Sequence, residues 1–395
     1  MRNIPFSVWR LTLAYSLMMS GTSMVVLIAG IIGIAIAPTA GMATLPIAMA
    51  VVGLASSTLP TGKLLGRFGR RKVFIGYAVL AIGSALLASV SLAHASFAGF
   101  SVASFLMGWS AAAGHQYRFA ALEAVPAHQA PKATSALLLG GLLGAFVGPE
   151  LAVRGHWLLE TEFAGSFLLL AGAYVVGLFI VSSYRDSTHF AHTQADNRGR
   201  PMSVILRSPS VFLAIGASGI AYGVMSLIMS ATPISMTQHS HHSLEATKVV
   251  IQSHIAGMFL PSLFYSYLFD RLNFKGMLWS GLLIFFTCLV VALLNTDFIH
   301  YWLALVLLGI GWNFLYLTGT NLLAYGYQPE ERFRVQSTND FLVFTIQALV
   351  SFSSGWLMYQ WQWNGLLLAC VPLLLVFMVL LARTDFATLT PAKSS

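Results

Sequence analysis

Charged residues are scarce in this sequence. Asp, Glu, Lys and Arg together make up 9% of its 395 positions, whereas apolar residues make up 57%. Soluble domains carry about a quarter charged residues, so this composition excludes an ordinary soluble protein and places the chain in lipid. The formal net charge is +8, but the basic residues form small clusters at the ends of apolar runs, without a basic stripe interleaved with aromatic residues. This distribution argues against a nucleic-acid partner.

Cysteines and enzyme motifs are also nearly absent. The two cysteines, Cys288 and Cys370, lie inside apolar runs, which argues against a disulfide framework or a metal site. His239, His241 and His242 form a histidine-only tract that no cysteine or carboxylate pattern completes, so we expect no metal. The sequence has no G-x-x-x-x-G-K-[ST], G-x-S-x-G or H-E-x-x-H pattern. We therefore expect neither ATP-driven pumping nor a soluble enzyme, and no cofactor.

What the chain has in abundance is long apolar runs. A run of about 20 such residues spans a bilayer as a helix. Twelve runs qualify, at residues 9–35, 42–65, 73–95, 97–122, 132–152, 163–184, 210–235, 247–269, 277–295, 300–324, 336–359 and 365–383. The first run continues to about residue 37, longer than the apolar part of a signal peptide, and no small-residue cleavage site ends it. The sequence thus predicts an all-α integral membrane protein with twelve transmembrane helices.

The basic residues predict the orientation, because Lys and Arg in short loops stay in the cytoplasm. With both termini cytoplasmic, only Arg154 and Lys248 fall on the outer side. Residues 185–209 form a polar linker, which divides the chain into an N-terminal six-helix bundle at 1–184 and a C-terminal one at 210–395.

One short basic turn occurs twice. Read with an offset of 204, the stretch from Gly62 to Arg71 falls on the stretch from Ser266 to Lys275. A second pair of landmarks, Gly108-Trp109 and Gly311-Trp312, recurs at an offset of 203. Internal repeats of this length in a membrane protein indicate a fused duplication, which is typical of secondary transporters.

The first copy of the turn resembles the signature loop of the major facilitator superfamily, G-x-L-x-D-R-x-G-R-R between helices two and three, and the second copy falls where that family keeps a weaker repeat. The resemblance covers essentially the whole chain. It implies two pseudo-symmetric six-helix bundles, a substrate site between them and alternating access. It also implies gating roles for Gly62, Gly66, Arg67, Gly69, Arg70, Arg71, Asp270, Arg271 and Lys275. The acidic residue expected in the first copy is Gly66 here, whereas the second copy keeps Asp270.

This departure suggests a hypothesis for the gate. Arg67 and its basic neighbours have no carboxylate of their own, and by pseudo-symmetry they should face the start of helix eleven, where Asp340 supplies the missing charge. The alternative is that the basic cluster only enforces topology against anionic lipid. Transport by Asp340→Asn and by an Arg67/Asp340 charge swap separates the two.

Helix five carries Gly144, Gly148 and Pro149, which resemble the G-x-x-x-G-P motif of antiporters in that family. Small residues four apart also let helices approach closely, so plain packing is the alternative interpretation.

Ionisable residues at membrane depth are costly and usually functional. His115 and Arg118 share one face of helix four, and we expect Arg118 to bind an anionic group or pair with a carboxylate. The candidates for proton coupling are Asp340, Glu150, His254 and His115. For Glu150 and His254 the alternative is a structural role.

The resemblance implies that helices one, four, seven and ten line the substrate cavity, so the uncharged polar and aromatic residues at their midpoints are the candidates for it. With the ionisable candidates, the set is Ser20, Thr22, Trp109, His115, Arg118, Tyr222, Ser226, His254, Trp312, Asn313, Tyr316 and Asn321. Trp109 and Trp312 are expected to be repeat-related and to hold a flat organic solute by stacking, the alternative being packing between helices.

These patterns predict a monomeric secondary transporter of the cytoplasmic inner membrane that moves a small organic solute, coupled to protons and directed outward. The alternative is an uptake permease or facilitator for a small metabolite or a vitamin-like compound. A membrane enzyme or sensor is a third class, which the scattered acidic residues and histidines and the short tail disfavour.

Overall fold

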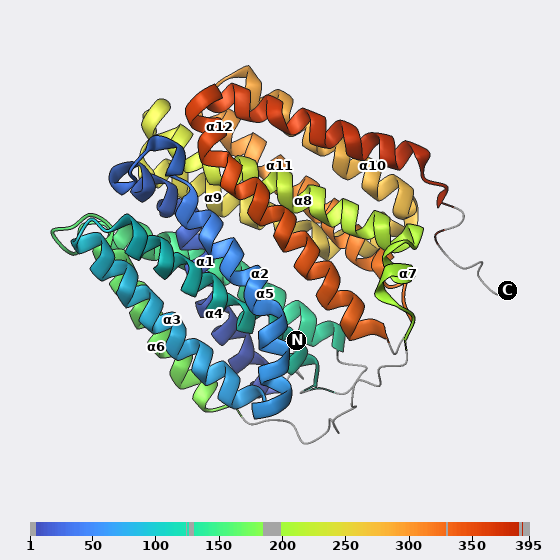
Figure 1. The fold of residues 1–395 in the computed structure, drawn as a ribbon, viewed down its shortest axis with the longest axis horizontal. Helices are drawn as coiled ribbons and strands as arrows, with labels where there is room; N and C mark the ends of the chain where they lie inside the picture. Colours follow the sequence, from blue (N-terminus) through green and yellow to red (C-terminus); the bar gives the residue numbers. More distant parts are fainter. Residues whose placement is uncertain are drawn as a thin grey trace. The chain divides into compact units, whose positions relative to one another are not determined.

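The computed structural model describes residues 5–123, 125, 130–184, 199–328, 331–386 and 389, and its regular structure in these residues is helical (Figure 1). The longer helices are α1 (Phe6–Ile36), α2 (Leu45–Phe68), α3 (Arg70–Ala93), α4 (Phe97–Glu123), α5 (Ala130–Gly155), α6 (Ala164–Ser182), α8 (Pro209–Ile234), α9 (Leu244–Phe259), α10 (Tyr265–Leu294), α11 (Phe298–Leu323) and α12 (Arg332–Arg383). Helix α7 (Met202–Leu206) is a short one before α8. Helices suit lipid because each satisfies its own backbone hydrogen bonds.

All twelve predicted spans fall on helical segments. Within α12 a break at Gln362 (φ 56°, ψ −166°) separates the last two spans, and within α10 a break at Asn273 does the same for the eighth and ninth. The eighth span itself is interrupted by a 3-10 turn, Leu260–Phe264, which contains Pro261 and therefore lacks one backbone donor. Nine helices within the described residues are long and apolar enough to cross a membrane.

Large apolar side chains lie on the outside of these helices. Phe179 is 72% exposed, and Leu283 and Leu349 are each 66% exposed. Such exposure would be unfavourable in water but suits contact with acyl chains. The expectation of an all-α, multi-pass membrane protein is confirmed.

The chain divides into two compact units. The first comprises Met1–His192 and Ser243–Lys248, and the second comprises Thr193–His242 and Val249–Ser395. In the first unit α1 packs against α5, α2 against α4, and α3 against α6. In the second unit α8 packs against both α11 and α12, and α10 packs against α11.

The doubled basic turn has the same backbone device in both copies. Gly69 separates α2 from α3 with φ 78° and ψ 162°, and Asn273, at the offset of 204, interrupts α10 with φ 50° and ψ −172°. Positive φ with an extended ψ is a conformation that residues with a Cβ rarely adopt. Asn273 compensates through its side chain, whose Oδ1 accepts hydrogen bonds from the backbone N–H of Lys275 at 3.0 Å and of Gly276 at 3.3 Å.

A close contact between helices is also repeated. In the first unit, a Cβ atom on Gly53 would lie 2.0 Å from the Phe105 carbonyl oxygen, and one on Gly108 would lie 1.8 Å from the Ala50 carbonyl oxygen. In the second unit, a Cβ atom on Gly257 would lie 2.9 Å from the Val306 carbonyl oxygen. One on Gly309 would lie 2.3 Å from the His254 carbonyl oxygen. Helices α2 and α4 therefore meet as α9 and α11 do.

This contact corrects the expected equivalence of the two Gly-Trp pairs. Gly108 corresponds in packing to Gly309, two residues before Gly311. Gly311 instead faces α10, since a Cβ atom there would lie 2.5 Å from Cδ1 of Phe285. Two residues turn a helix by about 200°, so Trp109 and Trp312 occupy different faces of their helices. The prediction that they are repeat-related is wrong.

Candidate functional site

Four aromatic rings meet in the second unit. Tyr222 of α8 lies 5.2 Å from Trp312, 5.2 Å from Tyr316 and 5.6 Å from Phe344, measured between ring centroids and edge-on in each case. Trp312 and Tyr316 stack on each other at 4.7 Å with an interplanar angle of 26°. We call these four residues the aromatic cluster.

Small residues bring the three helices of the aromatic cluster together. Gly319 of α11 lies against α8, where an added Cβ atom would be 2.8 Å from Oγ of Ser218 and 2.9 Å from the Ala214 carbonyl oxygen. Gly219 of α8 leaves room for Ile346 of α12 in the same way, at 2.8 Å. Trp312 and Tyr316 are four residues apart, so both rings lie on one face of α11. The rings can therefore interlock at the α8 surface.

Buried polar atoms without a hydrogen-bond partner gather around these helices. In the part of the chain that the structure describes, they include Nε1 of Trp312, Oγ of Ser218, Oε1 of Gln347 and Oγ of Ser351. Buried polar groups are nearly always hydrogen-bonded, and each exception calls for an explanation such as a ligand or a water molecule. Gln347 lies one turn after Phe344 on α12, so the two side chains share a face.

Two other predicted cavity residues serve the packing of α11 on α9. The Asn313 side chain donates from Nδ2 to the Met258 carbonyl oxygen at 2.7 Å and to Oγ of Ser262 at 2.6 Å. His254 is fully buried, and its Nδ1 donates to the Leu305 carbonyl oxygen at 2.8 Å. Both residues thus hold α11 to the interrupted eighth span. Ser226 is buried on α8 and Asn321 is exposed near the end of α11.

Asn321 lines a separate cavity of about 330 Å³ with Tyr265, Phe269, Phe274, Ala324 and Tyr325. The aromatic residues that line this cavity contact one another in a row. Tyr265 stacks on Phe269 at 5.7 Å, and Phe274 lies edge-on to both Phe269 and Tyr325. Asn321 and Tyr316 were both predicted to line one cavity, but they lie on different faces of α11.

The first-unit candidates do not form a comparable cluster among the described residues. Ser20 is buried and its hydroxyl donates to the Leu17 carbonyl oxygen at 2.5 Å, whereas Thr22 is exposed. Trp109 is half-buried against Phe105 at 5.8 Å. His115 is exposed. The side chain of Arg118 lies outside the described residues, so its predicted role stays a prediction.

The glycines of helix five pack α5 on α1. An added Cβ atom would lie 2.6 Å from the Ser16 carbonyl oxygen at Gly144 and 2.0 Å from the Ser20 carbonyl oxygen at Gly148. Oγ of Ser23 donates back to the Gly144 carbonyl oxygen at 2.9 Å. The packing interpretation of the motif is therefore met by direct contacts, and the antiporter interpretation stays a prediction.

The gating candidates lie at helix ends. Arg67 and Asp270 are exposed, and Arg71 donates to the Ser182 carbonyl oxygen at 2.9 Å. Arg271 lies over the ring of Tyr267 at 4.2 Å. Asp340 accepts a hydrogen bond from Asn339 at 3.1 Å. The latch between Arg67 and Asp340 stays a hypothesis. So do the gating roles of the remaining set, Gly62, Gly66, Gly69, Arg70 and Lys275.

Glu150 binds Lys248 and Arg154, the two cations that the predicted orientation places on the outer side. Lys248 donates to Oε1 of Glu150 at 2.8 Å, and Nε of Arg154 lies 3.2 Å from Oε2. Lys248 also pairs with Glu245 at 2.5 Å, and its side chain is only 8% exposed. These two cations, which the predicted orientation places on the outer side, are thus neutralised in place by carboxylates. This is the structural role that the sequence left open for Glu150.

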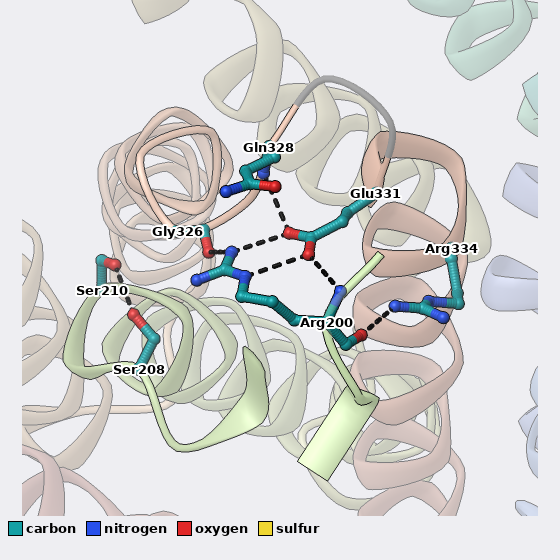
Figure 2. A network of polar contacts seen from close by, with 7 residues as sticks. All are labelled: Arg200, Ser208, Ser210, Gly326, Gln328, Glu331 and Arg334. Atoms are coloured by element: carbon teal, nitrogen blue, oxygen red, sulfur yellow. Dashed lines mark hydrogen bonds and ion pairs between the residues drawn. The ribbon is translucent and has the colours of Figure 1, made fainter. Parts of the chain in front are cut away.

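A network that the sequence did not indicate fixes the end of the linker (Figure 2). Arg200 donates from Nε to Oε1 of Glu331 at 3.0 Å and from a terminal nitrogen to Oε2 at 2.7 Å. Its backbone N–H also reaches Oε1 at 2.8 Å. The Gly326 carbonyl oxygen accepts from the guanidinium at 3.0 Å, and Arg334 donates to the Arg200 carbonyl oxygen.

Glu331 is buried, with 1% of its surface exposed. The Arg200 guanidinium lowers the pKa of the Glu331 carboxyl to about 2, helped by the backbone N–H groups of Gln328 and Arg200. Because Arg200 and Glu331 are 131 positions apart, no local spacing could have revealed the pair. The same holds for Phe344 and Gln347, whose relevance appears only when α12 is packed on α8.

Comparison with known proteins agrees with this architecture. The chain is 33% identical over 378 residues to the riboflavin transporter RfnT of Brucella anthropi, covering 94% of each sequence. It is 31% identical to the uncharacterized MFS-type transporter YddS of Bacillus subtilis, covering 76% of this chain and 73% of that one.

Among solved structures, a bacterial homolog of the human lysosomal transporter Spinster, in an inward-facing and occupied conformation, matches with a TM-score of 0.72. The identity is 15% and the match covers 95% of each chain, so this likeness concerns the fold. The family model described as Major Facilitator Superfamily matches residues 11–228 and again 214–394. Its relatives are transporters, and the chain belongs to the major facilitator superfamily.

Proposed function

We propose that this protein carries riboflavin, or a closely related planar heterocycle, into the cell across the cytoplasmic membrane. The observation that supports this most directly is the aromatic cluster, because stacked and edge-on rings are suited to grip a flat conjugated ring system. The similarity to a riboflavin transporter over nearly the whole of both chains supports the same substrate class.

Import is proposed over the outward direction that helix five suggested. A vitamin is a compound that cells obtain from outside, so inward transport is the direction that serves the cell. The glycines of helix five are accounted for by their contacts with α1, which removes the main reason to favour export. Inner-membrane location with both termini in the cytoplasm belongs to the same proposal, supported by the distribution of Lys and Arg.

Coupling to protons is part of the proposal. A carboxylate or histidine at membrane depth is needed to carry the proton, and Asp340, Glu150, His254 and His115 are the candidates. His254 and Glu150 already have partners within their units. Neutral substitutions of all four, each assayed for transport driven by a pH gradient, test which of them carries the proton.

The decisive experiment is uptake of radiolabelled riboflavin into proteoliposomes containing the purified protein, with and without an imposed pH gradient. We expect accumulation, accelerated by a gradient that drives protons in the same direction. Preloaded vesicles measure the opposite direction in the same assay. Failure to move riboflavin in either direction would contradict the substrate, and stronger export than import would contradict the direction.

Tyr222→Ala tests whether the aromatic cluster holds the substrate. It removes the ring that contacts the other three, and we expect riboflavin affinity to fall at least tenfold, since aromatic contacts contribute about 1 kcal/mol each. Trp361→Ala is the matched control, because Trp361 is 54% exposed and pairs with Trp356 rather than with the aromatic cluster.

A further inference from the structure

Trp312 differs from two other tryptophans of the second unit in what its indole nitrogen contacts. Nε1 of Trp302 donates to Oγ of Ser253 at 2.9 Å, and Nε1 of Trp363 donates to the Ala292 carbonyl oxygen at 3.3 Å. Nε1 of Trp312 is buried and has no acceptor among the described residues, although the side chain is only 5% exposed. The same helix supplies both a satisfied donor, Trp302, and an unsatisfied one, ten residues on.

Gln347 presents the complementary atom. Its Oε1 is a buried acceptor that lacks a donor within the described chain. Phe344, one turn earlier on α12, contacts Tyr222, and Tyr222 contacts Trp312. Tyr222 thus links the helix face that bears Gln347 with the helix face that bears Trp312. A donor and an acceptor, each unsatisfied, flank one group of rings.

Leaving such groups unsatisfied is costly. Burying a donor or acceptor without a partner costs about 1 to 3 kcal/mol for each group. A folded chain gains nothing from two of them at one place, unless a bound molecule supplies the partners. Sites built to hydrogen-bond a substrate also reject analogues that lack the matching group, because the buried groups of the protein are then left unpaired.

We propose that Trp312 Nε1 and Gln347 Oε1 hydrogen-bond the polar edge of the transported ring, and that the ring carries a carbonyl acceptor beside an N–H donor, as in a cyclic imide or lactam. The aromatic cluster contacts the faces of the ring, and these two atoms hydrogen-bond the polar groups along its edge. This inference rests on the proposed function and deepens it, because it names the groups that select one flat heterocycle over another.

The test uses two substitutions that remove the polar atom and keep most of the apolar side chain. Trp312→Phe keeps a ring against Tyr222 and Tyr316, and Gln347→Met keeps the length of the side chain. Without ligand, we expect Gln347→Met to have an unchanged or higher melting temperature, because an unsatisfied buried group has been removed. Trp312→Phe also loses ring volume, so its melting temperature should fall, but by less than that of a tryptophan whose N–H has a partner. We expect each variant to bind riboflavin about tenfold more weakly, as measured by flavin fluorescence titration of the purified protein.

Trp302→Phe and Trp363→Phe are the matched controls. Each removes an indole N–H that has a partner, so the melting temperature should fall while riboflavin affinity stays unchanged. A larger stability loss in the controls and a larger affinity loss in Trp312→Phe separate a ligand-binding donor from a structural one.

An analogue methylated on the imide nitrogen tests the edge directly. The wild-type protein should bind this analogue at least tenfold more weakly than riboflavin. Gln347→Met should bind both equally, because it has no acceptor for the lost N–H to reach. Trp312→Phe should still discriminate between the two, since its missing group faces the carbonyl.

The outcomes separate the two proposals. If the wild-type protein binds riboflavin and both variants bind it equally well, the inference is wrong while the proposed function stands. If the wild-type protein binds other planar imides or lactams from a panel of pteridines and purines but not riboflavin, the proposed substrate is wrong while the edge contact stands. Binding of none of them refutes both. If Trp312→Phe loses as much melting temperature as Trp302→Phe and keeps its affinity, the N–H has an internal partner, such as a water molecule, and the inference is also wrong.

Discussion

Gly53 and Gly108 hold α2 against α4 in the first unit, and Gly257 and Gly309 hold α9 against α11 in the second. The closest approaches of an added Cβ atom to backbone oxygen are 1.8 Å and 2.0 Å in the first contact and 2.3 Å and 2.9 Å in the second. Gly108 on α4 faces the carbonyl oxygen of Ala50, whereas Gly309 on α11 faces the carbonyl oxygen of His254. The duplicated packing has therefore been kept, while its tightness and its polar content have diverged.

Buried polar atoms without a partner occur among the described residues of both units, for example at Thr44 and Tyr117 in the first. Among the described residues, those near the aromatic cluster all belong to the second unit, on α8, α11 and α12. Among the described residues, the first unit therefore keeps the closer packing of the repeat, whereas in the second unit buried polar atoms without a partner lie on the same helices as the aromatic cluster.

The largest effect is expected from placing a Cβ atom in the tighter contact. Gly108→Ala should destabilise the protein by about 3 kcal/mol or more and Gly257→Ala by about 1 kcal/mol, with Gly309→Ala between them. The melting temperatures of the three variants in detergent, together with their expression levels, measure the order of these losses. Gly83→Ala is the control, since nothing lies within 4 Å of its added Cβ atom on α3. Equal losses at Gly108 and Gly257 would show that the two contacts are equally tight.

The next effect concerns the diverged position. His254→Ala should lower stability by about 2 to 4 kcal/mol, because it removes a buried ring and leaves a void. His94→Ala is the control, because His94 bonds the Val90 carbonyl oxygen from an exposed position. If His254→Ala unfolds no more easily than His94→Ala, the histidine contributes nothing to the second copy of the contact.

The Arg200–Glu331 pair tests a polar addition of the second unit. Arg200→Ala leaves a buried carboxylate without its cation, and we expect a loss of about 2 to 3 kcal/mol, less than for a fully buried pair because the Arg200 side chain is 40% exposed. Arg200→Lys should recover only part of the lost stability, because an ammonium group cannot contact both Glu331 carboxylate oxygens as the forked guanidinium does.

The same pair predicts a pH dependence with a definite sign. The folded pKa of Glu331 is about 2, below the value of an unfolded glutamate, so the pair stabilises the protein fully above about pH 4.5. That contribution declines as the pH falls toward 2. Melting curves of the wild type and Glu331→Gln should therefore converge over this range, and a constant difference down to pH 2 would refute the assignment.

The smallest effect should come from the doubled turn. Asn273→Ala keeps the unfavourable positive φ and loses the cap on Lys275 and Gly276, so a loss of about 1 to 2 kcal/mol is expected. Asn273→Gly relieves the backbone and loses only the cap, so it should cost less. If Asn273→Ala and Asn273→Gly are equally stable, the side-chain cap is the whole of the effect.

Much of the fold was predictable because lipid imposes a simple rule on sequence. Each bilayer span needs about 20 apolar residues, and all twelve predicted spans are helical. The doubled turn was equally readable, since Gly69 and Asn273 keep the same offset in sequence and in backbone conformation.

The alignment of α4 with α11 in the repeat could not be predicted from the sequence, for a physical reason. Gly-Trp at 108 and 311 looked equivalent, but packing is decided by which glycine faces a neighbouring carbonyl, and that is Gly309. Contacts such as Arg200 with Glu331 depend on distant segments meeting. Whether Trp312 or Trp302 lacks a hydrogen-bond partner depends on the rotation of α11, which the sequence of this mostly apolar helix does not specify.

The contact at Gly53 and Gly108 also has a genetic consequence. Every single-base change in a glycine codon that alters the residue introduces a side chain, so each one-step missense change at these codons adds at least a Cβ atom. At Gly108 that atom would lie 1.8 Å from the Ala50 carbonyl oxygen. Harmful missense alleles should therefore concentrate at these two codons. Any allele that persists in a population should carry a second substitution, in the turn of α2 around Ala50 or in the turn of α4 around Phe105, that moves the two helices apart.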